Sequence, residues 1–361
     1  MSLLKPDYNR SILSLMGSMT RRHGLPFDSS LQEVDELLQD DRPVLMLLMD
    51  GLSLAALNRL PEGSFLREHL FTTLHSVFPT TTTAATTSLM SGLYPQEHAW
   101  LGWNLYFKEL EAQAVTVFLD ETMNEKVALE KNFAKRRLAY ETVFSRLEKQ
   151  GVSVEVFSPF DGTYYHDLED LFRRLEGAIK ERQFIYAYHT EPDYLTHHVG
   201  TDSVELESWM IQFNHLVERY RHLADEAHFF ILADHGHINS EAIFLEDYPE
   251  LYQLLRQSPS MEMRASAIFV KEGMHEAFER IFKENFSDFL LLSQQEVLEA
   301  GLLGRGEIHP RVFDFLGDYL AIATGGRHLE EKRSYASGLI SQHAGLTKEE
   351  LMVPLIYLTD N

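Results

Sequence analysis

The sequence predicts an α/β fold with a largely parallel central sheet sandwiched by helices. Short runs rich in Val, Ile, Phe and Tyr are apolar on both alternating faces, as strands covered on both sides are. Segments with helical periodicity separate several of these runs, and such alternation is typical of a sheet covered by helices. The apolar runs are 44–49, 152–157, 183–188, 228–233, 265–270 and 353–358.

The expected helices carry start and stop signals. The first, residues 31–38, follows Asp28 and Ser29, two residue types that favour a helix start. Another begins near Val143 and stops at Gly151. The remaining helical patterns cover 168–179 and 203–224.

A chain of 361 residues exceeds the usual domain size of about 100–150 residues, but α/β enzymes of this length are often single domains. We predict one catalytic domain over 1–361. Residues that bind metals become sparse between about 239 and 333, which predicts a small inserted lobe there or an extension of the main sheet.

The net negative charge of the chain argues against anionic binding partners. Acidic residues number 55 against 32 basic ones, for a net charge of −23. This field repels nucleic acids and anionic membranes, so we expect neither as a partner and leave the oligomeric state open. An anionic phosphoester would also be repelled unless bound cations reverse the field locally.

The chain has no cysteine, which excludes disulfides, thiolate catalysis and Cys-based metal sites. Any metal must therefore bind His, Asp, Glu or hydroxyl groups. The first 25 residues lack the continuous apolar core of a signal peptide, and the run 44–49 is far shorter than the roughly 20 residues of a membrane helix. We expect a cytoplasmic protein.

Five short motifs contain side chains suited to metal binding or nucleophilic attack. Asp50 and Asp234 each follow an apolar run, and ligands of such folds bind beyond the carboxyl ends of the strands. The segment FPTTTTAATTSLMSGLYP predicts a loop and then a helix that stops at Gly92, with Thr82 near the positive helix start. The candidates are Asp50, Thr82, Asp193, His197, Asp234, His235 and His343.

The order and spacing of these motifs resemble the alkaline phosphatase superfamily, in particular its nucleotide pyrophosphatase/phosphodiesterase branch. MDGL at Asp50 resembles the family's first ligand motif, and Thr82 stands ten residues before the glycine of GLYP, as the family's nucleophile does. PDYLTHHVG and ADHGH match the patterns PD-x-x-x-H-x-x-G and DHG. Two departures are Ala99 in place of a glycine and residues 83–86 in place of Phe-Pro-Asn-His.

The resemblance implies a site for two divalent metal ions, with Zn²⁺ expected and Mn²⁺ as the alternative. One ion would bind Asp193, His197 and His343, and the other Asp50, Thr82, Asp234 and His235. Thr82 would be the nucleophile that forms a phosphothreonine. Asn104 is a candidate donor to a phosphate oxygen, although Trp103 stands where the family has its asparagine.

Several assignments have competitors. His309 and His328 compete with His343 for the last ligand position, and His198 and His237 are interpreted as solvated neighbours of the ligands. Arg264 has two open interpretations, a phosphate contact or an edge cap. Trp100, Trp103, Tyr106 and Phe107 are candidates for a base or leaving-group pocket, with buried packing as the favoured use of most of them.

The leading hypothesis is a metal-dependent hydrolase that cleaves phosphodiester or pyrophosphate bonds of a nucleotide-like small molecule. Two alternatives on the same scaffold are a phosphomonoesterase and a phosphonate hydrolase. A third is a non-catalytic protein that binds a phosphate ligand.

Overall fold

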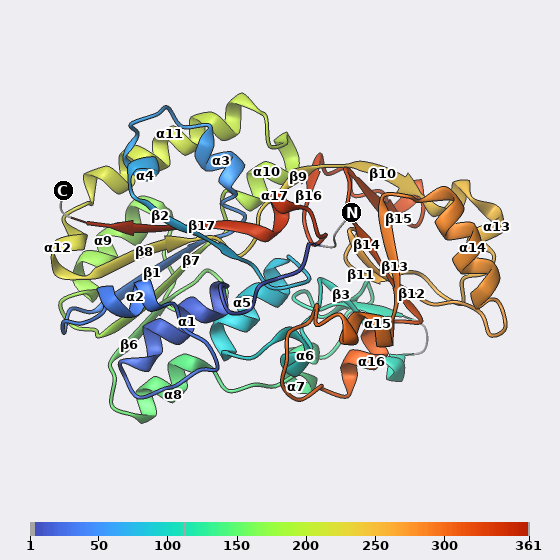
Figure 1. Ribbon diagram of the computed structural model, residues 1–361, viewed down its shortest axis with the longest axis horizontal. Helices are drawn as coiled ribbons and strands as arrows, with labels where there is room; N and C mark the ends of the chain where they lie inside the picture. Colours follow the sequence, from blue (N-terminus) through green and yellow to red (C-terminus); the bar gives the residue numbers. More distant parts are fainter. Residues whose placement is uncertain (1–3, 111–112, 360–361) are drawn as a thin grey trace.

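The computed structural model describes residues 4–110 and 113–359, in which two large sheets lie side by side (Figure 1). In the first sheet every strand runs parallel to the others except β17, which is antiparallel to both of its neighbours. Its strands in spatial order are β2 (Leu70–His75), β17 (Met352–Leu358), β8 (His228–Leu232), β1 (Val44–Met49), β7 (Phe184–His189) and β6 (Val154–Phe157).

Helices cover both faces of this sheet, as predicted for runs that are apolar on both sides. All residues of β1 and β8 are buried. Helices α3, α4 and α11 lie on one face and α1, α5 and α8 on the other (Figure 1). The helices of this half are α1 (Ile12–Arg21), α2 (Gln32–Leu37), α3 (Leu54–Asn58), α4 (Phe65–Glu68), α5 (Thr82–Ser91), α8 (Val143–Lys149), α9 (Leu168–Ala178), α10 (Asp193–Val199), α11 (Val204–Arg219), α12 (Leu223–Glu226) and α17 (Lys348–Leu351).

The predicted fold class, a mostly parallel sheet between helices, is confirmed, and the helix patterns hold with one difference. The pattern over 203–224 forms two helices, because α11 ends at Arg219 and α12 begins at Leu223. The first sheet and its helices bury the largest apolar cluster of the described chain.

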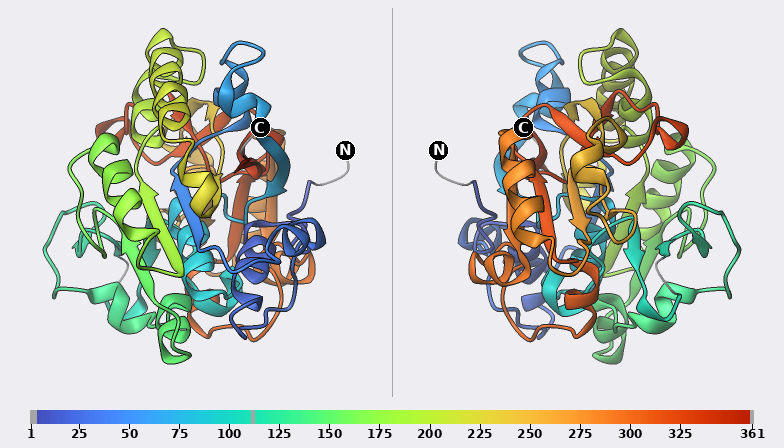
Figure 2. Two further views of the ribbon diagram at one scale, coloured as in Figure 1. Left: turned by 90° about the vertical axis from the view of Figure 1, so that its left-hand side faces the viewer. Right: turned by 90° about the vertical axis from the view of Figure 1, so that its right-hand side faces the viewer.

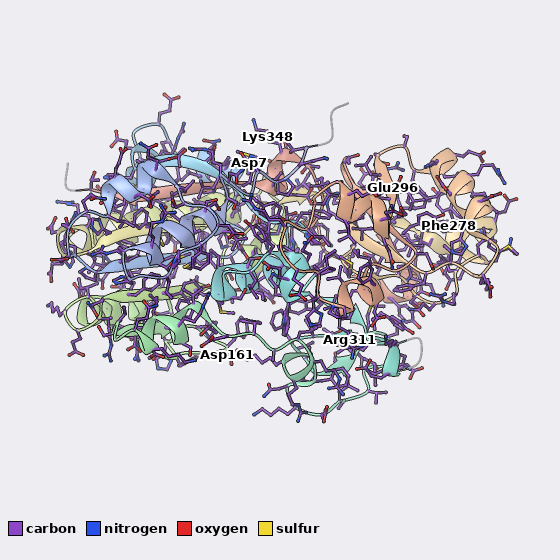
Figure 3. All side chains as sticks on the ribbon, turned by 60° about the horizontal axis from the view of Figure 1, so that its bottom comes forward. Asp7, Asp161, Phe278, Glu296, Arg311 and Lys348 are labelled. Carbon is purple, nitrogen blue, oxygen red and sulfur yellow. The ribbon has the colours of Figure 1, made fainter. Side chains whose placement is uncertain are left out.

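The second sheet is antiparallel throughout. The run 265–270, predicted with the parallel strands, contributes β12 to this sheet instead. Its strands in order are β13 (Phe289–Ser293), β14 (Tyr319–Ala323), β12 (Ala265–Ile268), β11 (Ser260–Met261), β3 (Asn104–Tyr106), β4 (Ala114–Thr116) and β5 (Glu121–Thr122). Figure 3 shows Phe278, Glu296 and Arg311 in this half.

Two separate segments build the second half. Strands β3 to β5 come from 104–122 and β11 to β14 from 260–323, so only the latter lies within the lobe predicted over 239–333. Helix α14 packs over one face of this sheet through Phe278 and Phe282 (Figure 2). The helices and turns of this half are α6 (Pro95–His98), α7 (Phe133–Arg137), α13 (Pro249–Tyr252), α14 (His275–Asn285), α15 (Gln294–Glu299), α16 (Arg311–Phe315), η1 (Lys108–Leu110), η2 (Leu245–Asp247) and η3 (Arg333–Tyr335).

Two short ladders complete the structure. Strand β10 (Glu241–Phe244) runs parallel to β15 (Arg327–Glu330), and β9 (Ile238–Asn239) runs antiparallel to β16 (Ser341–Gln342). The second ladder pairs the residues that follow His237 with those that precede His343. Within the described ranges, no helix has both the length and the apolar character needed to cross a membrane.

Candidate metal centre

Four of the candidate residues lie at one edge of the first sheet: Asp50, Asp193, Asp234 and His235. Strands β1, β7 and β8 are parallel, so their carboxyl ends meet there. Asp50 directly follows β1, and its amide donates to the carbonyl of His189 at the end of β7 (2.9 Å). The amide of Asp193 in turn donates to the carbonyl of Asp50 (2.9 Å), which fixes the start of α10 at this edge.

The first ligand group consists of Asp193, His197 and His343, whose ligand atoms lie within 4.8 Å of one another. Asp193 and His197 are four residues apart in α10 and therefore share one helix face, with His197 Nε2 3.4 Å from Asp193 Oδ1. Strand β16 brings His343 Nε2 to 3.8 Å from the same oxygen. The competitors His309 and His328 belong to no such group among the described residues.

The second ligand group consists of Asp50, Asp234 and His235. His235 Nε2 lies 3.4 Å from Asp50 Oδ1 and 3.6 Å from Asp234 Oδ2. All three side chains are buried. Asp234 and His235 come from the chain just beyond β8, so two strand ends supply the whole group.

Thr82 joins this second group from the start of α5. Its hydroxyl lies 3.3 Å from Asp50 Oδ1 and 3.1 Å from His235 Nε2. Because His235 Nδ1 contacts the carbonyl of Gly236 (3.0 Å), that nitrogen donates and Nε2 accepts. The hydroxyl of Thr82 therefore faces two acceptors, either of which can take its proton. Thr82 is half-buried, so a ligand can reach it.

The electrostatics of the site call for a cation. Burial raises the pKa of Asp50, and the nearby charge of Asp193 raises it further. Burial likewise raises the pKa of Asp234, and the charge of Asp50 adds to the effect. Asp234 Oδ2 is buried without any hydrogen-bond partner. An orphaned carboxylate oxygen among carboxylates and imidazoles fits a divalent metal, which would satisfy that oxygen and offset the repulsion.

His237 is not the solvated neighbour that the sequence suggested. Its side chain is 1% exposed, with Nε2 2.7 Å from Asp193 Oδ1. The interpretation was wrong because β9, which begins directly after His237, pairs with β16, and His237 is buried beside this ladder. Burial lowers the pKa of His237 to about 4. His198, by contrast, is exposed, as expected.

Two further polar residues of the site were missed. The hydroxyl of Tyr188 donates to Asp50 Oδ2, but its run of apolar residues predicted only a core strand. Glu262 accepts from the hydroxyl of Thr81 (2.7 Å) and from the amide of Trp103 (2.7 Å), and burial raises its pKa to about 7. No motif marks Glu262, which reaches the site through the pairing of β11 with β3.

The remaining candidates, Asn104, Trp100 and Trp103, lie in or beside the second sheet and belong to neither ligand group. The side-chain oxygen of Asn104 accepts from Thr116 (2.8 Å), which leaves its amide nitrogen as the donor group. Trp100 is buried and its Nε1 donates to the carbonyl of Leu138 (2.9 Å). Trp103 is exposed and contacts Phe118, with ring centroids 5.2 Å apart.

Arg264 forms an internal ion pair and does not face the ligand groups. It is fully buried and pairs with Glu350 through two contacts, Nε to Oε1 at 2.6 Å and Nη2 to Oε2 at 2.8 Å. Its Nη1 and Nη2 also donate to the backbone carbonyls of Arg327 (2.8 Å), at the start of β15, and Gly325 (2.9 Å). The interpretation as a phosphate contact was therefore wrong, whereas these contacts resemble the edge cap. The pair belongs to the framework between the two sheets.

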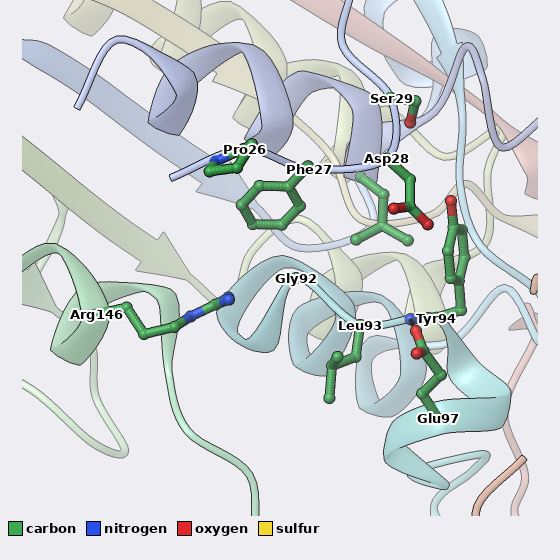
Figure 4. A pocket seen from close by; sticks show the side chains of 10 residues that line it. Pro26, Phe27, Asp28, Ser29, Gly92, Leu93, Tyr94, Glu97 and Arg146 are labelled. Atoms are coloured by element: carbon green, nitrogen blue, oxygen red, sulfur yellow. Dashed lines mark hydrogen bonds between the residues drawn. The ribbon is translucent and has the colours of Figure 1, made fainter. Parts of the chain in front are cut away.

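A cavity of about 150 Å³ at the far end of α5 is separate from the ligand groups (Figure 4). Phe27, Gly92, Tyr94 and Arg146 help to line it, and none of its lining residues belongs to either group. Ten helical residues span about 15 Å, so this cavity and Thr82 lie at opposite ends of the same helix.

Several solved structures share the fold of this chain. Murine ectonucleotide pyrophosphatase/phosphodiesterase 5 superposes with a TM-score of 0.67 at 17% identity over 87% of each chain. An inactive form of the same murine protein was solved with AMP. Phosphonoacetate hydrolase from Sinorhizobium meliloti 1021, solved with phosphonoformate, gives a TM-score of 0.64 at 17% identity over 88% of this chain and 90% of that one.

Among curated proteins, none matches this chain in sequence. The family model for type I phosphodiesterase/nucleotide pyrophosphatase matches residues 44–345, a span that includes every candidate metal ligand. Because this match covers most of the chain, the protein belongs to the type I phosphodiesterase/nucleotide pyrophosphatase family, within the alkaline phosphatase superfamily.

Proposed function

We propose that the protein is a two-metal phosphoesterase that hydrolyses phosphodiester or pyrophosphate bonds of a nucleotide-like small molecule through a covalent threonine intermediate. The observation that supports it most directly is the setting of Thr82. Its hydroxyl lies at a helix start, between a carboxylate oxygen (3.3 Å) and an imidazole nitrogen (3.1 Å) that both accept protons.

The residues that would hold the metals are the two ligand groups. Asp193, His197 and His343 would hold one ion, and Asp50, Asp234, His235 and the Thr82 oxygen the other. When bound, the ions would make a hydroxyl or water more acidic and offset the charge on the phosphate. The orphaned Asp234 Oδ2 supports a cation in the second group.

Thr82 Oγ would attack phosphorus, with its proton passing to an adjacent acceptor, while the bond to the leaving oxygen breaks and the first alcohol or phosphate departs. The threonine then carries the remaining phosphoryl ester. Attack by water breaks the new Oγ–P bond, restores the hydroxyl of Thr82 and releases the second product. The amides at the start of α5 would orient the phosphate oxygens.

Two observations favour a diester over a monoester. Among the described residues, every ion pair of Asp50, Asp193 and Asp234 is with histidine, so no Lys or Arg at ion-pair distance from these carboxylates adds positive charge for a dianionic phosphate. Near Thr81 the site presents the carboxyl of Glu262, and beside it the exposed ring of Trp103. A carboxylate repels a second phosphate charge, whereas an apolar ring accepts an uncharged ester group.

A phosphonate hydrolase is the second candidate, because the fold matches phosphonoacetate hydrolase nearly as well as it matches the nucleotide enzymes. Phosphonoacetate carries an additional carboxylate, which needs a cation. The missing Lys or Arg at the described ligand groups counts against this candidate as well.

The test compares initial rates on bis-p-nitrophenyl phosphate, p-nitrophenyl phosphate and phosphonoacetate, using metal-stripped protein with Zn²⁺ or Mn²⁺ restored. We expect a metal-dependent preference for the diester. Thr82→Ala should lower the rate at least about 10³-fold with both ions still bound, while Thr86→Ala, one turn later in α5, should retain it. Full turnover in Thr82→Ala would refute the covalent mechanism, and a preference for the monoester or the phosphonate would reassign the substrate.

A further inference from the structure

The cavity at the far end of α5 is lined by charged side chains of both signs. Figure 4 shows Arg146 on one side of it and Asp28 and Glu97 on the other. Within residues 4–110 and 113–359, none of these three side chains takes part in an ion pair. A cavity with unpaired opposite charges at its two ends is suited to a ligand that carries both charges.

Arg146 reaches the cavity from α8 and is half-buried. Its Nη2 donates to the carbonyl of Ser91 (2.6 Å) at the end of α5, and its Nε is buried without a hydrogen-bond partner. A guanidinium has five N–H donors and binds carboxylate oxygens best through two of them. Among the described residues only one donor of Arg146 is engaged, so this end of the cavity is suited to an anionic group.

The opposite end carries two carboxylates. Glu97 Oε2 accepts from the amide of Tyr94 (2.9 Å), burial raises the pKa of Glu97, and the nearby charge of Asp28 raises it further. The neighbouring Arg305 donates to the hydroxyl of Tyr94 (2.7 Å) and to Asn9 Oδ1 (2.7 Å) instead of to either carboxylate. Two like charges that repel each other favour a bound ammonium between them.

The volume of the cavity limits the size of the ligand. At about 150 Å³ it matches an engineered cavity of another protein that holds one benzene molecule, so about six to eight non-hydrogen atoms fit. Leu13, Phe27 and Leu93 also line the cavity and supply apolar contacts for a short hydrocarbon chain.

The charged ends of the cavity lie close together. A Cβ built on Gly92 would lie 3.0 Å from Arg146 Nη2, whereas Glu97 binds the amide of Tyr94, two residues later. Two residues span at most about 7 Å, and a charge-assisted hydrogen bond at each end takes up about 2.8 Å. A ligand whose two charged groups are separated by one to three carbon atoms therefore fits.

We propose that this cavity binds a short amino acid, with its carboxylate on Arg146 and its ammonium between Asp28 and Glu97. Such a zwitterion gives the guanidinium an anionic partner and the two carboxylates a cation. The site is separate from the metal centre and does not depend on the proposed hydrolysis. It lies at the C-terminal end of α5, the helix that begins with Thr82.

The experiment measures binding of glycine, β-alanine and 4-aminobutyrate to the metal-loaded protein by calorimetry, with propionate and propylammonium as probes of a single charge. We expect at least one amino acid to bind about 10-fold or more tightly than either single-charge probe, because only a zwitterion bonds at both ends. Asp28→Asn and Arg146→Gln should each weaken this binding by about 10-fold or more. Asp41→Asn and Arg173→Gln, which change exposed residues of the same types, should leave it unchanged.

Three results would overturn the proposal. The first is that none of the three amino acids binds at millimolar concentration, and the second is that propylammonium binds as tightly as they do. The third is binding that survives both Asp28→Asn and Arg146→Gln, because amino acids also chelate metal ions and would then be bound at the metal centre. If Arg146→Gln fails to fold, Asp28→Asn at an exposed position still decides.

Discussion

The two ligand groups of the centre are built by the chain in different ways. Asp50 directly follows strand β1, and Asp234 and His235 come shortly after β8. Thr82 begins helix α5, so every member of the second group stands at the end of a strand or at the start of a helix. The first group takes Asp193 and His197 from α10 and His343 from beyond β16. The β9–β16 ladder and Ser341 help to bring these parts together.

This difference has a structural consequence. The parallel register of β1 with β8 fixes Asp50, Asp234 and His235 of the second group, and all three are buried. In the first group, His197 is held by the carbonyl of Ser341, and the hydroxyl of the same serine contacts the neighbouring His237. We therefore expect changes in the second group to affect chemistry most, and changes in the first to affect how tightly one ion is held.

The largest effect is expected from Asp234→Asn. The amide retains an oxygen for the backbone donors Gly51 and His235 but removes the charge at Oδ2, so the second ion should be lost and turnover should fall at least about 10³-fold. The metal-free variant should melt a few degrees higher than metal-free wild type, because the repulsion between Asp50 and Asp234 is gone.

Metal content and calorimetry with and without EDTA would measure both effects. Asp225→Asn, at an exposed site in α12, is the control and should behave like the wild type in both assays. If metal-free Asp234→Asn melts at a lower temperature than metal-free wild type, the Asp234 carboxylate does not destabilise the protein in the absence of a metal ion.

His343→Gln should have the next largest effect and tests whether the groups load separately. We expect one ion to be lost, the second group to stay loaded, and the rate to fall about 10²-fold. His309→Gln, the half-buried competitor from the sequence, should retain both ions. The number of metal ions per protein is the measurement. Simultaneous loss of both ions would contradict the claim that the two groups bind their ions separately.

Tyr188→Phe tests whether the hydrogen bond from Tyr188 to Asp50 strengthens metal binding by the second group. The tyrosine hydroxyl donates to Asp50 Oδ2, and loss of such a supporting hydrogen bond usually weakens metal binding about 10–100-fold. Tyr186→Phe, two residues earlier in β7 and equally buried, is the matched control. A competition titration with a chelator measures the affinity; equal affinities in the two variants would show that the contact is not supportive.

Glu262→Gln should have the smallest effect, a change in selectivity. Since burial raises the pKa of Glu262 to about 7, its carboxyl is neutral below that pH and charged above it. The ratio of diester to monoester rates should therefore rise through pH 7 in the wild type, and by several-fold less in the variant. A pH series on both substrates would reveal this, and identical profiles would remove Glu262 from the substrate pocket.

Sequence alone predicted the first sheet because its strands and helices carry local signals. Runs that are apolar on both faces, such as Val44–Met49, require cover on both sides, and the residues after them meet at one edge. Motif spacing then sufficed to name Asp50, Asp193 and His197. The antiparallel second sheet was not foreseen, because its pairing of β3 with β11 joins residues more than 150 positions apart.

The same reason explains the missed site residues. His237, Glu262 and Tyr188 acquire their positions from long-range contacts, with Ser341, Thr81 and Asp50 respectively. Arg264 was misjudged because its partner Glu350 is 86 residues away. Local patterns mark residues at strand ends, but they do not show which distant segment will cover them.

The central claim is that Thr82 carries the phosphoryl group between two displacements. The most direct test is the stereochemistry of hydrolysis of a chiral phosphorothioate diester in ¹⁸O-labelled water. Each in-line displacement inverts phosphorus, so a covalent threonine intermediate predicts net retention. Net inversion would mean that water attacks the substrate directly, and it would contradict a covalent role for Thr82.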